Sequence, residues 1–297
     1  MSPTRVSVLT LLAMIAFAGN SLLCRLALKH TGIDAASFTS IRIISGALVL
    51  WSIVLVRGSA RSASGSWPSA FALFAYAAGF SFAYVSLSAG TGALLLFGAV
   101  QVTMISYGLW TGERLRWRQA AGLVLAFGGL VGLLLPGLSA PPLHGSALML
   151  AAGVAWGVYS LRGKGVGDPT GVTAGNFLRA VIFAAGLSVA TLPWASLDSA
   201  GVWYAISSGA LASGVGYAVW YTALRGLKAT SAATVQLSVP VIAALGGIVF
   251  LGEVVTLRLL VAAAAILGGI ALVIVENRQS RQTPDPSIQG GRAQARR

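Results

Sequence analysis

Apolar stretches long enough to cross a membrane follow one another along this chain. The hydrocarbon core of a bilayer requires about 20 apolar residues per helix. Charged residues are only 9% of the 297, against about 25% in an ordinary soluble domain, so the folded surface must face lipid. The sequence therefore predicts an all-α integral membrane protein with ten transmembrane helices, at 6–24, 36–56, 68–88, 91–111, 117–135, 143–161, 171–192, 200–223, 231–251 and 257–275.

The positions of the basic residues predict how these helices are oriented. Cytoplasmic loops of membrane proteins are enriched in lysine and arginine. With the N-terminus in the cytoplasm, three basic residues fall outside (Arg25, Lys29 and Arg258), whereas fifteen fall in cytoplasmic segments. We therefore expect both termini to be cytoplasmic, in a bacterial-type inner membrane. The fifteen are scattered over six segments, so the net charge of +13 predicts contact with lipid and no nucleic-acid partner.

The chain also repeats itself after about 140 residues. The matches keep their order along the chain, and they pair Phe17 with Trp156, Asn20 with Tyr159, Arg42 with Arg179, Gly112-Glu113 with Gly252-Glu253, and Gly128-Gly129 with Gly268-Gly269. Each half holds five spans, an odd number, so the second half must enter the membrane from the opposite face. We expect two inverted five-helix repeats, at 1–138 and 139–276, an arrangement typical of transporters. Residues 277–297, polar and rich in arginine, are expected to form a disordered cytoplasmic tail.

Polar and aromatic residues inside the spans are the candidates for a substrate site. Polar groups within a membrane are costly and often functional. An amino acid would need hydrogen bonds for its charged groups and an apolar or aromatic wall for its side chain. The candidate substrate-binding residues are Phe17, Asn20, Phe80, Tyr84, Gln101, Tyr107, Trp156, Tyr159, Tyr217 and Gln236. For any single aromatic residue the alternative is anchoring at the membrane interface or helix packing.

Pro240 is the one proline in the middle of a predicted span. It cannot donate a hydrogen bond to the carbonyl of Gln236, four residues earlier, and this carbonyl would lie on the same face as the Gln236 side chain. A broken backbone at membrane depth must face protein or water. Pro240 is therefore predicted to mark either a flexible substrate contact or a static kink.

Four charged residues are expected to have structural or gating roles. Arg42 and Arg179 lie within spans and could hold a carboxylate, but snorkelling or pairing with helix-end carbonyls is the simpler interpretation. Glu113 and Glu253 lie at short turns near arginines. The glycine pairs at 128–129 and 268–269 are expected to allow close helix packing.

These features resemble the EamA family of the drug/metabolite transporter superfamily, over residues 6–276. The resemblance rests on the ten-span plan, on the Gly-Glu turns after the fourth and ninth spans, and on Arg42 within Phe38-Thr-Ser-Ile-Arg-Ile-Ile-Ser-Gly-Ala-Leu. The likeness is greatest to the YddG-type amino-acid exporters. Trp156-Gly157 keeps a Trp-Gly pair that the first half lacks, and Val100 stands where the family has a proline. The resemblance implies alternating-access transport.

We therefore expect the protein to export aromatic or other neutral amino acids, or related small metabolites. It is expected to act as a monomer without cofactors or metals. The alternative is a multidrug or cation efflux transporter, but such a pump needs a carboxylate within the membrane, and none of the seven acids lies mid-span. An enzyme is not expected, because His30 and His144 lie near loops and no nucleophile–base pair or metal cluster is present. Proton-coupled and facilitative transport both remain open.

Overall fold

A computed structural model describes residues 2–58, 64–112, 117–137, 140–163, 167–227 and 235–280, with side chains up to Val273. The regular structure within these residues is helical. The elements are α1 (Pro3–His30), α2 (Ala35–Val56), α3 (Trp67–Tyr84), α4 (Ala89–Trp110), α5 (Trp117–Leu134), α6 (Leu143–Arg162), α7 (Pro169–Ala190), the 3₁₀ turn η2 (Leu192–Trp194), α8 (Ser199–Ser207), the π-helix η3 (Ser208–Val215), α9 (Gly216–Leu224), α11 (Ser238–Leu251) and α12 (Leu257–Ser280).

Short polar residues determine where many of these helices begin. A side-chain oxygen that accepts a first-turn N–H replaces a hydrogen bond that the helix cannot supply itself. Such caps begin α1, α2, α3, α4 and α8, at Ser2, Asp34, Ser66, Ser88 and Asp198 respectively. At the other end of a helix, Gly252 terminates α11 with a φ of 61°, a conformation that glycine adopts without steric cost.

Several predicted spans differ from the structure. Helix α12 runs to Ser280, five residues beyond the predicted end, so residues 277–280 of the expected disordered tail are helical, and the rest of that tail lies outside the described residues. Helix α1 continues six residues beyond the predicted end at residue 24, so Arg25 and Lys29 belong to its last turns. The eighth span is a continuous rod of α8, η3 and α9 with a π-helical centre. The ninth helix, α11, begins at Ser238, after an interruption at Leu237. Pro240 is therefore in the first turn of α11, where a missing N–H costs nothing, and it does not kink a continuous helix.

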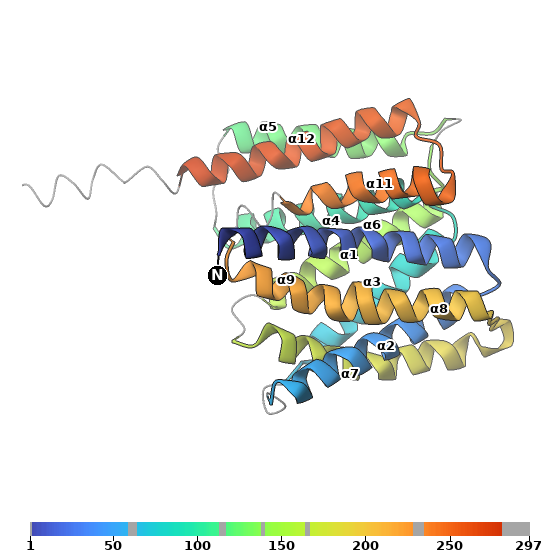
Figure 1. Ribbon diagram of the computed structural model, residues 1–297. Coiled ribbons are helices and arrows are strands. Elements are labelled where there is room, and N and C mark those ends of the chain that lie inside the picture. Colours follow the sequence, from blue (N-terminus) through green and yellow to red (C-terminus); the bar gives the residue numbers. More distant parts are fainter. Residues whose placement is uncertain are drawn as a thin grey trace, which may run out of the picture.

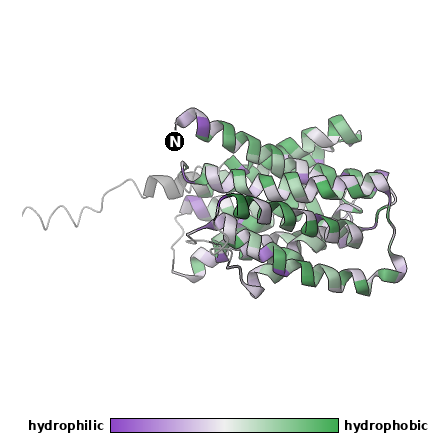
Figure 2. Cartoon of the chain, turned by 60° about the horizontal axis from the view of Figure 1, so that its bottom comes forward, coloured by the Kyte–Doolittle hydropathy of each residue, from purple (hydrophilic) through white to green (hydrophobic). Residues whose placement is uncertain are grey.

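The helices form a bundle in which they run along one another (Figure 1). α5 packs against α12 at one edge, α2 packs against α7 at the opposite edge, and α1, α3, α4, α6, α9 and α11 lie between them. Apolar side chains cover the outward surface of the bundle, including Leu48, Phe71, Val124 and Val249, and the helices carry mostly hydrophobic residues along their length (Figure 2). Among the described residues, five helices could cross a membrane by length and composition alone: α1, α2, α4, α5 and α7.

The packing of the helices repeats between the two halves. α6 packs against α3 and α4, and its counterpart α1 packs against α9 and α11. Equivalent helices also pack against each other, namely α2 with α7, α4 with α11, and α5 with α12, and the contact of α2 with η3 is repeated by that of α7 with α3. This is the pattern expected when two similar units are related by a two-fold axis.

The contact between α5 and α12 shows this relation at the level of single residues. A side chain on Gly129 would meet Ala262 and Ile266, and one on Gly269 would meet Gly122 and Ala126. A shift of 140 residues relates Gly129, Ala262 and Ile266 to Gly269, Gly122 and Ala126, respectively. Gly128 and Gly268 face open space, so one glycine of each predicted pair permits the close approach and the other does not.

The two halves run in opposite directions through the bundle. Near the end of α1, Arg25 donates to the carbonyl oxygens of Tyr84 and Val85. Near the beginning of α6, Gly145 lies against Ser86 and Ala83. The end of the first helix of one half therefore meets the same turn as the beginning of the first helix of the other half. We call this the far end of the bundle, and the end that carries Pro3 the N-terminal end.

Candidate substrate site

A narrow cavity lies in the middle of the bundle, between residues of both halves. Its volume is only about 20 Å³, enough for about one water molecule, so it is not an open chamber. The residues that line it are Phe17, Asn20, Ser21, Tyr76, Phe80, Leu96, Phe97, Trp156, Ala212, Tyr217 and Gln236. A cavity between two repeats is where transporters of this architecture bind their substrates.

Aromatic rings form one wall of the cavity. The Trp156 ring on α6 lies 4.8 Å from the Tyr76 ring and 5.3 Å from the Tyr217 ring, measured between centroids. Phe17 on α1 meets Tyr217 edge-on at 5.8 Å. Such rings present both an apolar face and, on tyrosine and tryptophan, a hydrogen-bonding group. The wall can therefore contact an apolar or aromatic side chain.

A buried network of hydrogen bonds forms another part of the site. The hydroxyl oxygen of Tyr76 accepts from Asn20 Nδ2 at 3.2 Å and from Arg42 Nη2 at 3.1 Å. The Ser208 hydroxyl donates to Asn20 Oδ1 at 2.6 Å. Because the Tyr76 oxygen accepts both bonds, its own proton is free to donate. The network thus joins α1, α2, α3 and η3 around one available donor.

The structure brings most of the predicted substrate residues together. The cavity is lined by Phe17, Asn20, Phe80, Trp156, Tyr217 and Gln236. Tyr159 stacks on Trp156 at 5.4 Å, and Gln101 is buried one helical turn beyond Phe97. Tyr84 lies against Gly92 and donates to the carbonyl of Ala89, closer to the far end. Tyr107 is 48% exposed in the last turn of α4 and does not reach the cavity.

Some cavity residues were not among those predicted: Ser21, Tyr76, Leu96, Phe97 and Ala212. Tyr76 could have been selected, because Tyr76, Phe80 and Tyr84 recur at intervals of four and share a face of α3. The others carry small or apolar side chains, which the sequence cannot distinguish from ordinary packing residues.

Arg42 lies deeper than the sequence suggested. We expected it to snorkel or to pair with helix-end carbonyls, but its side chain is buried, with a relative exposure of 2%. Its guanidinium lies over the rings of Phe80 and Tyr76, at 4.8 Å and 5.2 Å from their centroids. The reason is that the eighth residue of α2 faces α3, so the side chain is directed across the bundle and not along its own helix.

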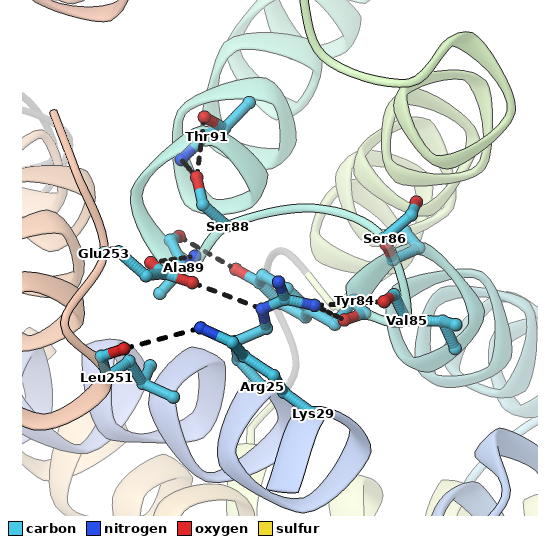
Figure 3. Close-up of polar contacts among 11 residues, drawn as sticks. Arg25, Lys29, Tyr84, Val85, Ser86, Ser88, Ala89, Thr91, Leu251 and Glu253 are labelled. Atoms are coloured by element: carbon cyan, nitrogen blue, oxygen red, sulfur yellow. Dashed lines mark hydrogen bonds and ion pairs between the residues drawn. The ribbon is translucent and has the colours of Figure 1, made fainter. Parts of the chain in front are cut away.

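An ion pair joins several helices at the far end (Figure 3). Arg25 Nε lies 3.2 Å from Glu253 Oε1, and its Nη1 donates to the carbonyls of Tyr84 and Val85. Glu253 Oε2 accepts from the N–H of Ala89 at 2.8 Å, at the beginning of α4, where a helix favours negative charge. This cluster connects α1, the turn between α3 and α4, and the turn after α11.

Other polar contacts hold the N-terminal end together. Arg179 donates to its own helix at the carbonyl of Gly175 and lies beside the ring of Trp67. Asn176 Oδ1 accepts from the N–H of Ser66 at 2.8 Å. These contacts fasten the beginning of α3 to α7. Glu113, the repeat counterpart of Glu253, lies outside the described residues.

The described residues hold no group of three or more histidine, cysteine, aspartate or glutamate side chains that could bind a metal ion. The side chains that line the cavity offer hydrogen bonding and aromatic contact, and the buried positive charge of Arg42 lies behind Tyr76.

Comparisons with known proteins place the chain in a family. The model of the EamA-like transporter family matches twice, at residues 4–135 and 143–275. An uncharacterized protein of Pseudomonas aeruginosa is 60% identical over 275 residues, 92% of this chain and 96% of that protein. A probable terminal-alkyne amino-acid exporter of Streptantibioticus cattleyicolor is 29% identical over 212 residues, 67% of this chain and 70% of that protein.

Two further similarities agree with this. The threonine/homoserine exporter RhtA of Salmonella typhimurium is 34% identical over 172 residues, 54% of this chain and 57% of that protein. A crystal structure that is 20% identical in sequence has the same fold, with a TM-score of 0.65, and the match covers 92% of this chain and 98% of that one. The chain belongs to the EamA-like transporter family of the drug/metabolite transporter superfamily: it is a membrane transporter built from two EamA repeats, and not an enzyme.

Proposed function

We propose that this protein exports aromatic or other neutral amino acids, or closely related metabolites, across the bacterial inner membrane. The observation that carries this proposal is the cavity itself, in which a buried hydrogen-bond network at Asn20 and Tyr76 faces an aromatic wall around Trp156. The two parts match the two parts of an amino acid. The names of two relatives, both amino-acid exporters, support the same substrate class.

The proposal includes ten membrane crossings, with the two repeats inverted and both termini in the cytoplasm. Five helices are long and apolar enough on their own, and the opposite directions of α1 and α6 support the inversion. The N-terminal end would then be cytoplasmic, as the distribution of basic residues favours. With polar contacts across both ends of the bundle, the described conformation corresponds to a closed intermediate between the two open states of alternating access.

A cation efflux pump is less well supported. Such a pump would hold its substrate with a carboxylate, yet the residues that line the cavity include none, and the charged side chain behind its wall is an arginine. A positive charge at this position would repel a cationic drug. The cavity therefore favours substrates that carry an anionic or polar group.

Transport into or out of proteoliposomes tests the proposal. Purified protein is reconstituted, and the flux of labelled threonine, homoserine, valine, phenylalanine and tryptophan is measured against protein-free liposomes. We expect flux of at least one of them. Flux should fall by about tenfold in Trp156→Leu, because each aromatic pair contributes roughly 0.5–1.5 kcal/mol.

Trp203→Leu is the matched control, since Trp203 on α8 is exposed on the outer surface and should leave the flux unchanged. Absence of flux for all five amino acids would contradict the proposal, and equal losses in the two tryptophan variants would contradict the assignment of the cavity.

A further inference from the structure

Arg42 is a buried positive charge for which the described part of the chain provides no carboxylate. Its side chain is buried, and its Nη1 atom makes no hydrogen bond within the described residues. The ion pair that these residues form joins Arg25 to Glu253 at the far end. The guanidinium of Arg42 contacts the Tyr76 hydroxyl and the faces of two aromatic rings.

Burial of this kind is unfavourable unless something compensates the charge. An arginine side chain cannot lose its proton in a protein, so it cannot become neutral as a buried lysine can. Removing an unpaired charge from water costs more free energy than contact with aromatic faces returns. A charge held at such a cost is suited to an anion that arrives from outside the chain.

The position of the guanidinium indicates where that anion would bind. Tyr76 and Phe80, the two rings beneath Arg42, both line the cavity. Arg42 Nη2 donates to the Tyr76 oxygen, whose own proton is left to donate. A small rotation of the Tyr76 side chain would open the guanidinium to the cavity, with Nη1 unoccupied. The aromatic wall at Trp156 and Tyr217 then lies on the other side of the same space.

We propose that Arg42, together with the Tyr76 hydroxyl, binds the carboxylate of the exported substrate, so that the transporter selects acids over the corresponding amides and amines. This inference rests on the proposed function and deepens it. A guanidinium binds a carboxylate through two parallel hydrogen bonds, and the Asn20–Ser208 pair beside it can orient the substrate's polar end. The repeat counterpart, Arg179, bonds to its own backbone and lies beside Trp67, away from the cavity.

Competition between an acid and its amide tests this assignment. In proteoliposomes, flux of labelled phenylalanine or threonine is measured while unlabelled phenylalanine, phenylalaninamide, threonine or threoninamide is added. We expect each acid to inhibit at least about tenfold more strongly than its amide, as loss of a hydrogen-bonded charge implies. Arg42→Gln should bring the two inhibition constants together, whereas the matched variant Arg179→Gln should retain the preference for the acid.

Thermal unfolding in detergent provides a readout that does not depend on flux. The acids should raise the Tm of the wild type more than the amides do, and Arg42→Gln should lose this difference. A folded Arg42→Gln protein that still prefers the acid overturns the assignment. If that variant does not fold, Arg42→Lys is measured in its place, because a lysine cannot form the paired hydrogen bonds. A ratio of the acid's inhibition constant to the amide's that is unchanged in Arg42→Lys then overturns the assignment. If no acid is transported and none raises the Tm, the proposed function fails as well.

Discussion

Asp34 links two loops at the far end of the bundle. Its carboxylate accepts the N–H groups of Ala36 and Ser37 at the beginning of α2, and that of Ser196 from the segment before α8. The backbone N–H of Asp34 in turn donates to the carbonyl of Ser196. Burial raises the pKa of this carboxyl, but the hydrogen bonds from Ser37, Ser196 and Ala36 outweigh burial, so its pKa lies below the usual 3.8.

A depressed pKa gives stability that depends on pH in one direction. The contribution is present above the ordinary pKa and is lost as the pH falls through the folded-state value. We expect Asp34→Asn to lower the free energy of unfolding at pH 7 by roughly 1 kcal/mol, because the amide oxygen can still accept from Ala36 and Ser37 but the amide nitrogen cannot accept from Ser196. The difference in Tm between wild type and variant, measured in detergent, should shrink below pH 3.8.

Asp198→Asn is the comparison, because Asp198 accepts a single N–H, from Gly201 in its own helix. Its effect on Tm at pH 7 should be smaller. A difference for Asp34→Asn that stays constant down to pH 3 would contradict the role of the ionised carboxylate.

At the scale of single residues, the sequence predicted which kinds of residue lie at the candidate site better than it predicted how deeply each side chain is buried. Asn20 and Trp156 were found because a polar or aromatic side chain within an apolar span is conspicuous, and the repeat doubles the signal. Arg42 was misjudged because its distance from the helix end says nothing about which neighbour its helix face meets. Tyr107 was selected for its place within the predicted span 91–111, but the last turn of α4 faces outward.

Among the helices, α5 and α12 depend on glycine for their contact. A Cβ on Gly269 would overlap the carbonyl oxygen of Gly122 and the backbone of Ala126, whereas a Cβ on Gly268 meets nothing. Gly269→Ala should therefore lower the Tm in detergent, by an amount corresponding to about 1–3 kcal/mol of overpacking. Gly268→Ala should raise it slightly or leave it unchanged, because alanine favours helix. Equal effects at the two positions would show that the helices do not approach each other as described.

The elements themselves differ in how far the sequence could predict them. The beginnings of α4 and α2 can be predicted, because Ser88 and Asp34 are residues whose side chains accept hydrogen bonds from the first-turn N–H groups of a helix. The π-helical η3 was not predicted. It contains Gly209, which packs directly against the backbone of Arg42 and the side chain of Ser45, a tertiary contact that the sequence does not show. The ninth span is interrupted at Leu237 and not at Pro240, where the sequence suggested a break, because a proline is tolerated in the first turn of a helix.

For the molecule as a whole, the Arg25–Glu253 pair should control opening of the far end. Cys24, the only cysteine in the sequence, is fully buried beside Arg25, and it provides a reporter without further mutation. We expect Glu253→Gln to increase the rate at which a maleimide labels Cys24 by roughly tenfold, because breaking a largely buried ion pair is costly.

Asp198→Asn removes a far-end carboxylate that the Arg25 cluster does not use, and it should leave the labelling rate unchanged. A Glu253→Gln protein that is labelled no faster than the wild type would show that the cluster only supports the fold and does not control access.

The reciprocal contact of α5 with α12 has a consequence for the balance between states. In a dimer of identical subunits, exchanging the two copies would turn one open state into the other, and both would have the same energy. Here the copies are fused and have diverged: Gly122 faces Gly269 where Ala262 faces Gly129, and Asn20 corresponds to Tyr159. In the alternating-access cycle that we propose, the two open states are therefore no longer equal in energy, and point substitutions in either half would change which of them is favoured.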